Sequence, residues 1–168
     1  KAPRSVFDCW QIGDARRGVF PTAAERAAAK AVYDATVQLP DGRYMTKYAN
    51  ATASEGHHLS GLYSTALGLG LWQINPSNEY VNGGPTKSNL TIHEEDPILL
   101  HMVQSGHFLG RSLHLEGEWA KVYGPVFFHV NRAADADAAW ADARRQTAVE
   151  QTQWPYQWVQ PVSVPDAY

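Results

Sequence analysis

The sequence contains a single cysteine, Cys9, among its 168 residues. One cysteine excludes an internal disulfide and leaves a thiolate zinc site without the partners it needs. No apolar run approaches the roughly 18 residues of a membrane-spanning helix. Fourteen basic and 17 acidic residues give a formal charge of −3, so the basic excess of a nucleic-acid-binding surface is also missing. We therefore expect neither a membrane nor a nucleic acid as partner.

Several catalytic signatures are missing as well. The chain has no Gly-rich phosphate loop, and it has no Gly-x-Ser-x-Gly elbow of the kind that carries the nucleophile of α/β-hydrolases. Seven histidines are present, but none forms a His-x-x-x-His pair with a nearby Glu. His57 and His58 are adjacent, and adjacent side chains on a strand point to opposite faces, so they would not share one ion. We expect no metal ion and no cofactor.

Two segments carry helical signals. The Ala-rich segment 21–35, with Thr22 as an N-cap, predicts a helical turn or a surface insertion. Residues 133–153 place Trp140 and other core candidates at helical spacing, which predicts a helix. Trp154-Pro155-Tyr156 should end it, because the residue before a proline disfavours helical backbone.

Most of the remaining chain carries strand and turn signals. Pro40-Asp41-Gly42 predicts a turn, and the alternating segment 43–48 after it predicts a strand. Further strands are expected in residues 59–74, 90–103 and 121–131. The predicted fold class is therefore mainly β: a large antiparallel β-sandwich with one late α-helix.

Aromatic side chains are abundant, with six Trp and eight Tyr. Aromatic rings stack on sugar rings, and they are also favoured in the cores of β-sheets. Trp72 and Tyr80 are the candidates for stacking on a sugar, although core packing is the favoured interpretation of Trp72.

Lys47 and His107 are the candidates for proton transfer. Lys47 sits in the middle of an aromatic-flanked strand, with Tyr44 and Tyr48 on either side. If its ammonium group is partly buried or lies near another cation, its pKa falls and it can act as a base. The alternative is that Lys47 has no catalytic role and is simply a charged residue on the edge of a sheet. His107 follows a Ser-Gly pair whose small side chains would let a ligand approach, but a single histidine of this kind is no catalytic signature by itself.

A set of short blocks runs in order through residues 44–131. The blocks are Tyr44-Met-Thr-Lys47-Tyr, His58-Leu-Ser-Gly-Leu-Tyr, Gly70-Leu-Trp72-Gln-Ile, Asn75-Pro-Ser-Asn-Glu79-Tyr, Gly83-Gly84-Pro85-Thr-Lys87, Gln104-Ser-Gly-His107 and Trp119-Ala-Lys-Val-Tyr-Gly-Pro125-Val-Phe. This ordered set resembles the rhamnogalacturonan endolyases of polysaccharide lyase family four. The helix region and its Trp154-Pro155-Tyr156 ending fit the same family.

The resemblance implies roles for particular residues. In that family a lysine is taken as the base and a histidine as the acid, and Lys47 and His107 match those positions. Arg4, Lys87 and Arg111 are the candidates for stabilising the carboxylate of the substrate, with Arg4 first. The family is taken to rely on protein groups rather than on calcium.

The resemblance also implies a domain organisation. Residues 1–160 would form the later part of a catalytic β-sandwich of the galactose mutarotase-like type, incomplete in this chain. Residues 161–168 would form a linker towards fibronectin-like and carbohydrate-binding domains that are absent. Leu100 and Met102 stand where some fungal members have tyrosines, a departure that bears on any tyrosine-assisted proton network.

The implied substrate is rhamnogalacturonan I, in which rhamnose alternates with galacturonic acid. β-Elimination would remove the C5 proton of a galacturonate, expel the 4-linked oxygen and leave an unsaturated uronate. Lys47 must be neutral to take that proton, so activity should be highest at alkaline pH. We expect a secreted monomer, and the sequons Asn50-Ala-Thr52 and Asn89-Leu-Thr91 are compatible with secretion.

Two other functions fit the same composition. A non-catalytic carbohydrate-binding sandwich would need the aromatic residues but neither Lys47 nor His107. An aldose-epimerase-like sandwich would pair His107 with a carboxylate base, either Glu79 or Glu116. Only the lyase eliminates a bond and forms the ultraviolet-absorbing unsaturated uronate.

Overall fold

The computed structural model describes residues 6–53, 58–77, 87–93, 96–101, 117 and 124–159. The strands are β1 (Cys9–Gln11), β2 (Arg17–Val19), β3 (Lys30–Tyr33), β4 (Thr36–Gln38), β5 (Tyr44–Thr46), β6 (Ala51–Ala53), β7 (Leu59–Ser64), β8 (Leu69–Ile74), β9 (Lys87–His93), β10 (Asp96–His101) and β11 (Phe127–Arg132). The helices are α1 (Ala23–Ala27), the 3₁₀ helix η1 (Lys47–Asn50) and α2 (Ala136–Gln153).

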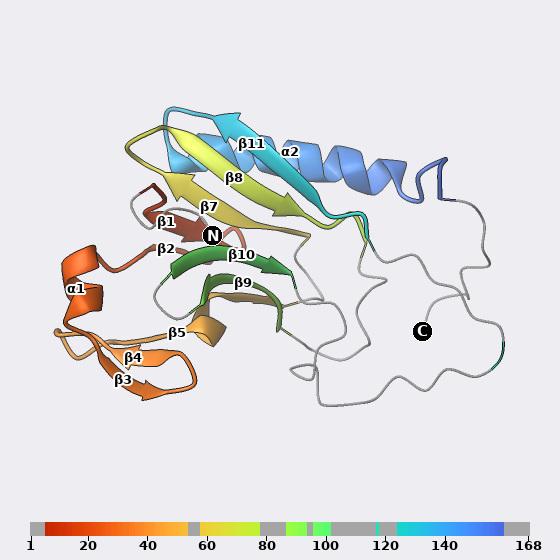
Figure 1. The fold of residues 1–168 in the computed structure, drawn as a ribbon. Coiled ribbons are helices and arrows are strands. Elements are labelled where there is room, and N and C mark those ends of the chain that lie inside the picture. The colour runs from red at the N-terminus through yellow and green to blue at the C-terminus, as the bar shows by residue number, and fades with distance from the viewer. Residues whose placement is uncertain are drawn as a thin grey trace.

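The described strands form antiparallel sheets (Figure 1). A five-stranded sheet has the order β11-β8-β7-β1-β2, and two three-stranded sheets have the orders β10-β9-β6 and β3-β4-β5. The prediction of a mainly β chain with one late helix is confirmed, and the arrangement is consistent with a partial β-sandwich. No helix in the described part of the chain is long and apolar enough to cross a membrane.

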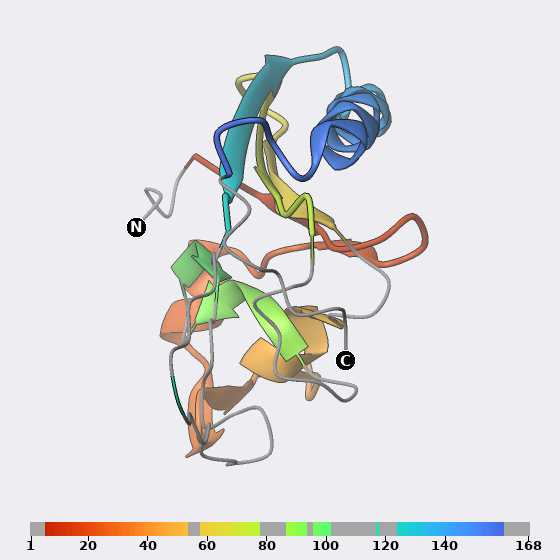
Figure 2. The same cartoon turned by 90° about the vertical axis from the view of Figure 1, so that its right-hand side faces the viewer.

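Helix α2 covers one face of the five-stranded sheet (Figure 2). Asp135 caps its N-terminus by accepting a hydrogen bond from the backbone N–H of Ala138 at 2.8 Å. The helix ends at Trp154, whose extended backbone suits the proline that follows it. The predicted helix and its ending are therefore confirmed.

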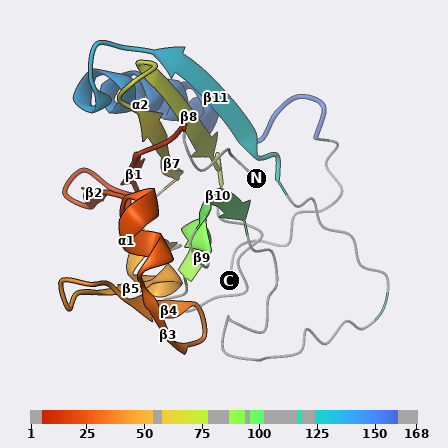
Figure 3. The same cartoon turned by 60° about the vertical axis from the view of Figure 1, so that its left-hand side comes forward.

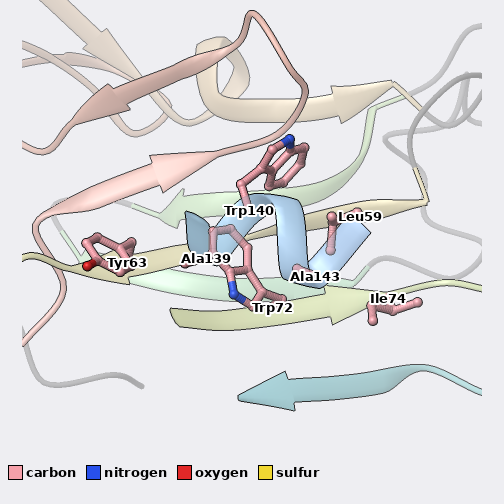
Figure 4. Packing of buried hydrophobic residues seen from close by; sticks show 7 residues of the cluster. All are labelled: Leu59, Tyr63, Trp72, Ile74, Ala139, Trp140 and Ala143. Atoms are coloured by element: carbon pink, nitrogen blue, oxygen red, sulfur yellow. The ribbon is translucent and has the colours of Figure 1, made fainter. Parts of the chain in front are cut away.

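The core between α2 and the sheet is built around two tryptophans (Figure 4). The rings of Trp72 and Trp140 meet edge to face with centroids 5.5 Å apart. Small residues on the inner side of the helix, Ala139 and Ala143, are fully buried and let its backbone approach the sheet. A Cβ atom on Gly61 would lie 2.3 Å from the Trp72 ring, so the neighbouring strand must leave this space empty.

The opposite face of the five-stranded sheet packs against a second cluster. Alternation along β7 directs Leu59 and Tyr63 towards α2 and Leu62 towards this cluster. Its buried members are Phe7, Phe20, Val37, Leu39, Met45 and Leu62. Because Val37 and Met45 come from β4 and β5, the cluster joins the β3-β4-β5 sheet to the rest of the core. Figure 3 shows that sheet at the end of the molecule opposite α2.

The segment before Lys47 differs from the prediction in two places. Thr22 caps α1 as expected, with a capping box to Glu25, but the helix ends at Ala27. Residues 30–33 form strand β3 instead, because they pair with β4 in a hairpin. The strand predicted over 43–48 ends at Thr46, so Lys47 begins a 3₁₀ turn rather than lying within the strand.

Candidate functional site

Lys47 lies at the junction of β5 and η1, with its side chain only 8% exposed. Its Nζ donates a hydrogen bond to Asp34 Oδ1 at 2.8 Å. Strand pairing explains the meeting of residues 13 positions apart: Thr36 lies opposite Thr46, which brings the β3–β4 turn beside the end of β5. The neighbouring hairpin therefore holds the ammonium group through Asp34.

The β3–β4 turn has a backbone geometry that few residues adopt. Asp34 and Ala35 have φ angles of 42° and 56°, in the left-handed region. Two consecutive residues of this kind are typical of the two-residue turns that join twisted hairpin strands. Aspartate tolerates the left-handed region better than most residues, whereas alanine is disfavoured there. The turn thus accepts local strain and, in this arrangement, presents the Asp34 carboxylate to Lys47.

Tyr48 completes this polar cluster. Its hydroxyl donates a hydrogen bond to Asp34 Oδ2 at 3.1 Å, so both oxygens of the carboxylate accept hydrogen bonds. The Nζ of Lys47 also lies 5.0 Å from the centroid of the Tyr48 ring, within the range of a cation–π contact. Two side chains, Asp34 and Tyr48, therefore contact the ammonium group of Lys47.

These contacts raise the pKa of Lys47 above its usual value. The hydrogen bond to Asp34 is the largest cause, and Tyr48 acts in the same direction. Burial lowers the pKa, as the sequence reasoning anticipated, but the hydrogen bond to the carboxylate outweighs it. The expected fall in the pKa of Lys47 is therefore absent, because its partner among the described residues is an anion.

Trp72 packs in the core. Its side chain is 1% exposed, and its Nε1 donates to Asn131 Oδ1 at 2.9 Å. A ring enclosed by α2 and the sheet offers no face to a sugar. The favoured interpretation of Trp72 is confirmed, and its assignment as a substrate-binding residue is corrected.

The other predicted site residues lie largely outside the described residues. These are Arg4, Tyr80, His107 and Arg111, together with Glu79, Glu116 and Met102. Lys87 begins β9, and its backbone pairs with Ala53, close to the end of η1 and β6. Leu100 lies in β10 opposite Leu90. The convergence of Lys47 with His107 therefore stays a prediction.

A second polar cluster, which the sequence did not reveal, joins β11 to α2. Asp142 Oδ2 lies 2.9 Å from His129 Nε2 and accepts a hydrogen bond from Asn131 Nδ2, while its Oδ1 accepts one from Arg145. The hydrogen bond with His129 is the first cause that lowers the pKa of Asp142 to about 2. The sequence predicted a strand and a helix in this region, but it did not show which of their residues face each other. Asn131 also bonds Trp72, which assigns this cluster to the packing of α2.

No group of three or more His, Cys, Asp or Glu side chains suited to a metal ion occurs within the described ranges.

Comparison with known proteins gives two similar sequences. A rhamnogalacturonate lyase from Dickeya dadantii is 30% identical over 150 residues, which cover 89% of this chain. A probable rhamnogalacturonate lyase C from Aspergillus oryzae is 30% identical over 111 residues, which cover 62% of it. The chain is related in sequence to rhamnogalacturonate lyases. It spans 25% of the length of the first of these proteins and 15% of the second. No family model and no solved structure matches the chain.

Proposed function

We propose that this chain is the later part of the catalytic β-sandwich of a rhamnogalacturonan lyase. The enzyme would cleave the rhamnose-(1→4)-galacturonate bond of the rhamnogalacturonan I backbone by β-elimination. The similarity to the Dickeya dadantii lyase carries this proposal, since it extends over 89% of the chain. The mainly β architecture supports it. Because the substrate is a wall polysaccharide, we also propose that the protein is secreted.

Lys47 is the proposed base. Its neutral amine would take the C5 proton of the galacturonate, and the electron pair left behind would expel the oxygen at C4 as the double bond forms. His107 would protonate that oxygen. The developing charge on the carboxylate calls for fixed cations, for which Arg4, Lys87 and Arg111 are the proposed groups.

Asp34 gives this mechanism a definite pH dependence. The ion pair holds the proton on Lys47, so the free amine forms only as pH rises towards the raised pKa. Activity limited by this base increases with pH on the alkaline side. The same contact orients the amine while it is protonated, because Asp34 accepts one of its hydrogen bonds.

The test is the ultraviolet absorbance of the unsaturated product. The full-length protein is incubated with rhamnogalacturonan I at alkaline pH in the presence of a chelator. We expect absorbance to rise, and we expect Lys47→Ala and His107→Ala each to reduce the rate about 10²- to 10⁴-fold, the range for loss of a general acid or base. Lys30→Ala, which removes an exposed lysine of β3, is the matched control and should retain the rate.

The absence of product from a folded full-length protein would reject the lyase and favour a carbohydrate-binding sandwich. A product that forms without ultraviolet absorbance would favour the epimerase-like alternative. Activity that the chelator abolishes would contradict a mechanism based on protein groups alone.

A further inference from the structure

An aromatic cluster follows α2, the helix that packs on the five-stranded sheet (Figure 1). Tyr156 lies at its centre. Its ring meets Phe127 of β11 and Trp154 edge to face, with centroids 5.8 and 5.7 Å away. The ring of Trp158 stacks on it with centroids 5.5 Å apart and planes 7° from parallel. Residues 154, 156 and 158 thus form a single layered group on the end of β11.

The inner and outer parts of this group have different surroundings. Tyr156 and Trp154 are half-buried, whereas Trp158 is 62% exposed. One face of the Trp158 indole is covered by Tyr156, so the exposed area belongs to its edge and its outer face. Trp158 therefore adds little to the core, and it presents a flat aromatic surface to solvent.

The support beneath Trp158 is fixed. The Tyr156 hydroxyl donates to Glu150 Oε2 at 2.6 Å and lies 3.3 Å from the Glu150 carbonyl oxygen. Burial and this carboxylate raise the pKa of Tyr156, so the hydroxyl stays protonated and keeps donating. Pro155 restricts the backbone between the two aromatic residues on either side of it. A rigid ring binds at a lower cost in conformational entropy than a mobile one.

The flanking residues define the chemistry of a ligand. The segment 151–159 reads Gln-Thr-Gln-Trp-Pro-Tyr-Gln-Trp-Val and contains no charged residue. The last turn of α2 has no basic residue either. Exposed glutamines at 151, 153 and 157 offer amide donors and acceptors, which suit hydroxyl groups. A carboxylate-bearing sugar would find no cation in this segment.

From this geometry we propose that Trp158, supported by Tyr156, is a binding platform for a neutral pyranose of a polysaccharide. The apolar C–H face of the sugar would stack on the outer face of the indole, and the nearby glutamines would bond its hydroxyls. The site would hold the polymer at a distance from the elimination chemistry. Only the choice of a polysaccharide as ligand rests on the proposed function, because stacking requires neither Lys47 nor His107.

The test is affinity electrophoresis of the full-length protein in gels containing galactan, a neutral polymer, or polygalacturonate, a charged one. A Lys47→Ala background prevents turnover and separates binding from catalysis. We expect galactan to retard the protein, Trp158→Ala to weaken that binding about tenfold, the loss typical of one aromatic anchor, and Trp158→Phe to retain most of it. Tyr33→Ala is the matched control, since it removes an aromatic side chain that is more exposed but stands outside the cluster.

Three outcomes would overturn the proposal of a platform at Trp158. Unchanged binding by Trp158→Ala would show that the platform is not used, and retardation by polygalacturonate alone would show that charge decides binding. Quenching of tryptophan fluorescence by acrylamide, compared between wild type and Trp158→Phe, reports whether Trp158 is accessible in the full-length protein. An inaccessible Trp158 would show that another part of the protein covers it. Failure of the lyase assay with galactan binding intact would reject the proposed function alone.

Discussion

At the scale of residues, the proposed chemistry depends on the buried ammonium group of Lys47. Burial favours the neutral form of a lysine, and a bonded carboxylate favours the charged form, so their balance sets the pKa. At Lys47 the carboxylate of Asp34 has the larger effect. Asp34 itself stands in a left-handed turn that the chain would avoid without some compensation. The ion pair is one contact that offsets this strain.

Replacing Asp34 with Asn should lower the pKa of Lys47. Asparagine keeps a hydrogen-bond acceptor and tolerates the left-handed turn, but it removes the negative charge. If Lys47 is the base, the rise of the rate with increasing pH should occur at lower pH in the variant than in the wild type. The measurement is initial lyase rate against pH for the wild type and the variant.

Asp41→Asn is the control for this shift. Asp41 is also a turn carboxylate paired with a cation, but its partner is the exposed Arg43 rather than Lys47. Its profile should match that of the wild type. A profile for Asp34→Asn that keeps its midpoint would contradict the role of Lys47 as the titrating base.

At the scale of secondary-structure elements, the polar cluster around Asp142 joins β11 to α2. The pKa of Asp142 is lowered from 3.8 to about 2, so the ionised form stabilises the fold. That contribution is fully present above pH 3.8 and is lost as the pH falls through about 2. With a side chain 40% exposed, we discount the contribution for solvent screening to about 1 kcal/mol.

Asp142→Asn should therefore lower the free energy of unfolding at neutral pH and flatten its dependence on pH between about 4 and 2. Chemical denaturation at a series of pH values measures both effects. Asp137→Asn is the control, because Asp137 pairs with Arg17 at an exposed site and should matter less. Equal losses for the two variants would show that the contacts with β11 add no stability.

The close contact between β7 and β8 requires a residue without a side chain at Gly61. A Cβ atom at Gly61 would meet the Trp72 ring at 2.3 Å and the Leu71 carbonyl at 2.5 Å. Gly61→Ala should cost about 2–3 kcal/mol of stability, the upper range for overpacking. Gly42→Ala, with a φ of 87° but open space around it, should cost about 1 kcal/mol from backbone strain alone. Thermal denaturation ranks the two, and the reverse order would contradict this view of the core.

Local sequence signals determined some elements and not others. Helix α2 was predictable because its inner spacing and the proline beyond its end agree. Strand β3 was not, because the Ala-rich segment favours helix and the hairpin pairing with β4 prevails. Likewise, alternation suggested that the strand would continue through Lys47, but the chain turns there to direct that side chain towards Asp34.

At the scale of the whole molecule, two clusters of buried side chains lie on opposite faces of one sheet. The strand and turn signals predicted the class of this arrangement, antiparallel sheets with one late helix. They did not predict the candidate site. Lys47 was singled out mainly by resemblance, and the partner that determines its pKa, Asp34, became visible only when the two hairpins were placed together.

Among the strands that the structure describes, β11 stands at the end of the five-stranded sheet, with α2 on one side. On the other side Phe128 and Val130 are 62% and 58% exposed. A border strand with apolar side chains is a place where chains pair with one another when they are concentrated or partly unfolded. The practical consequence concerns handling: dilute samples and a polar substitution at position 128 offer the most direct route to a preparation that stays in solution.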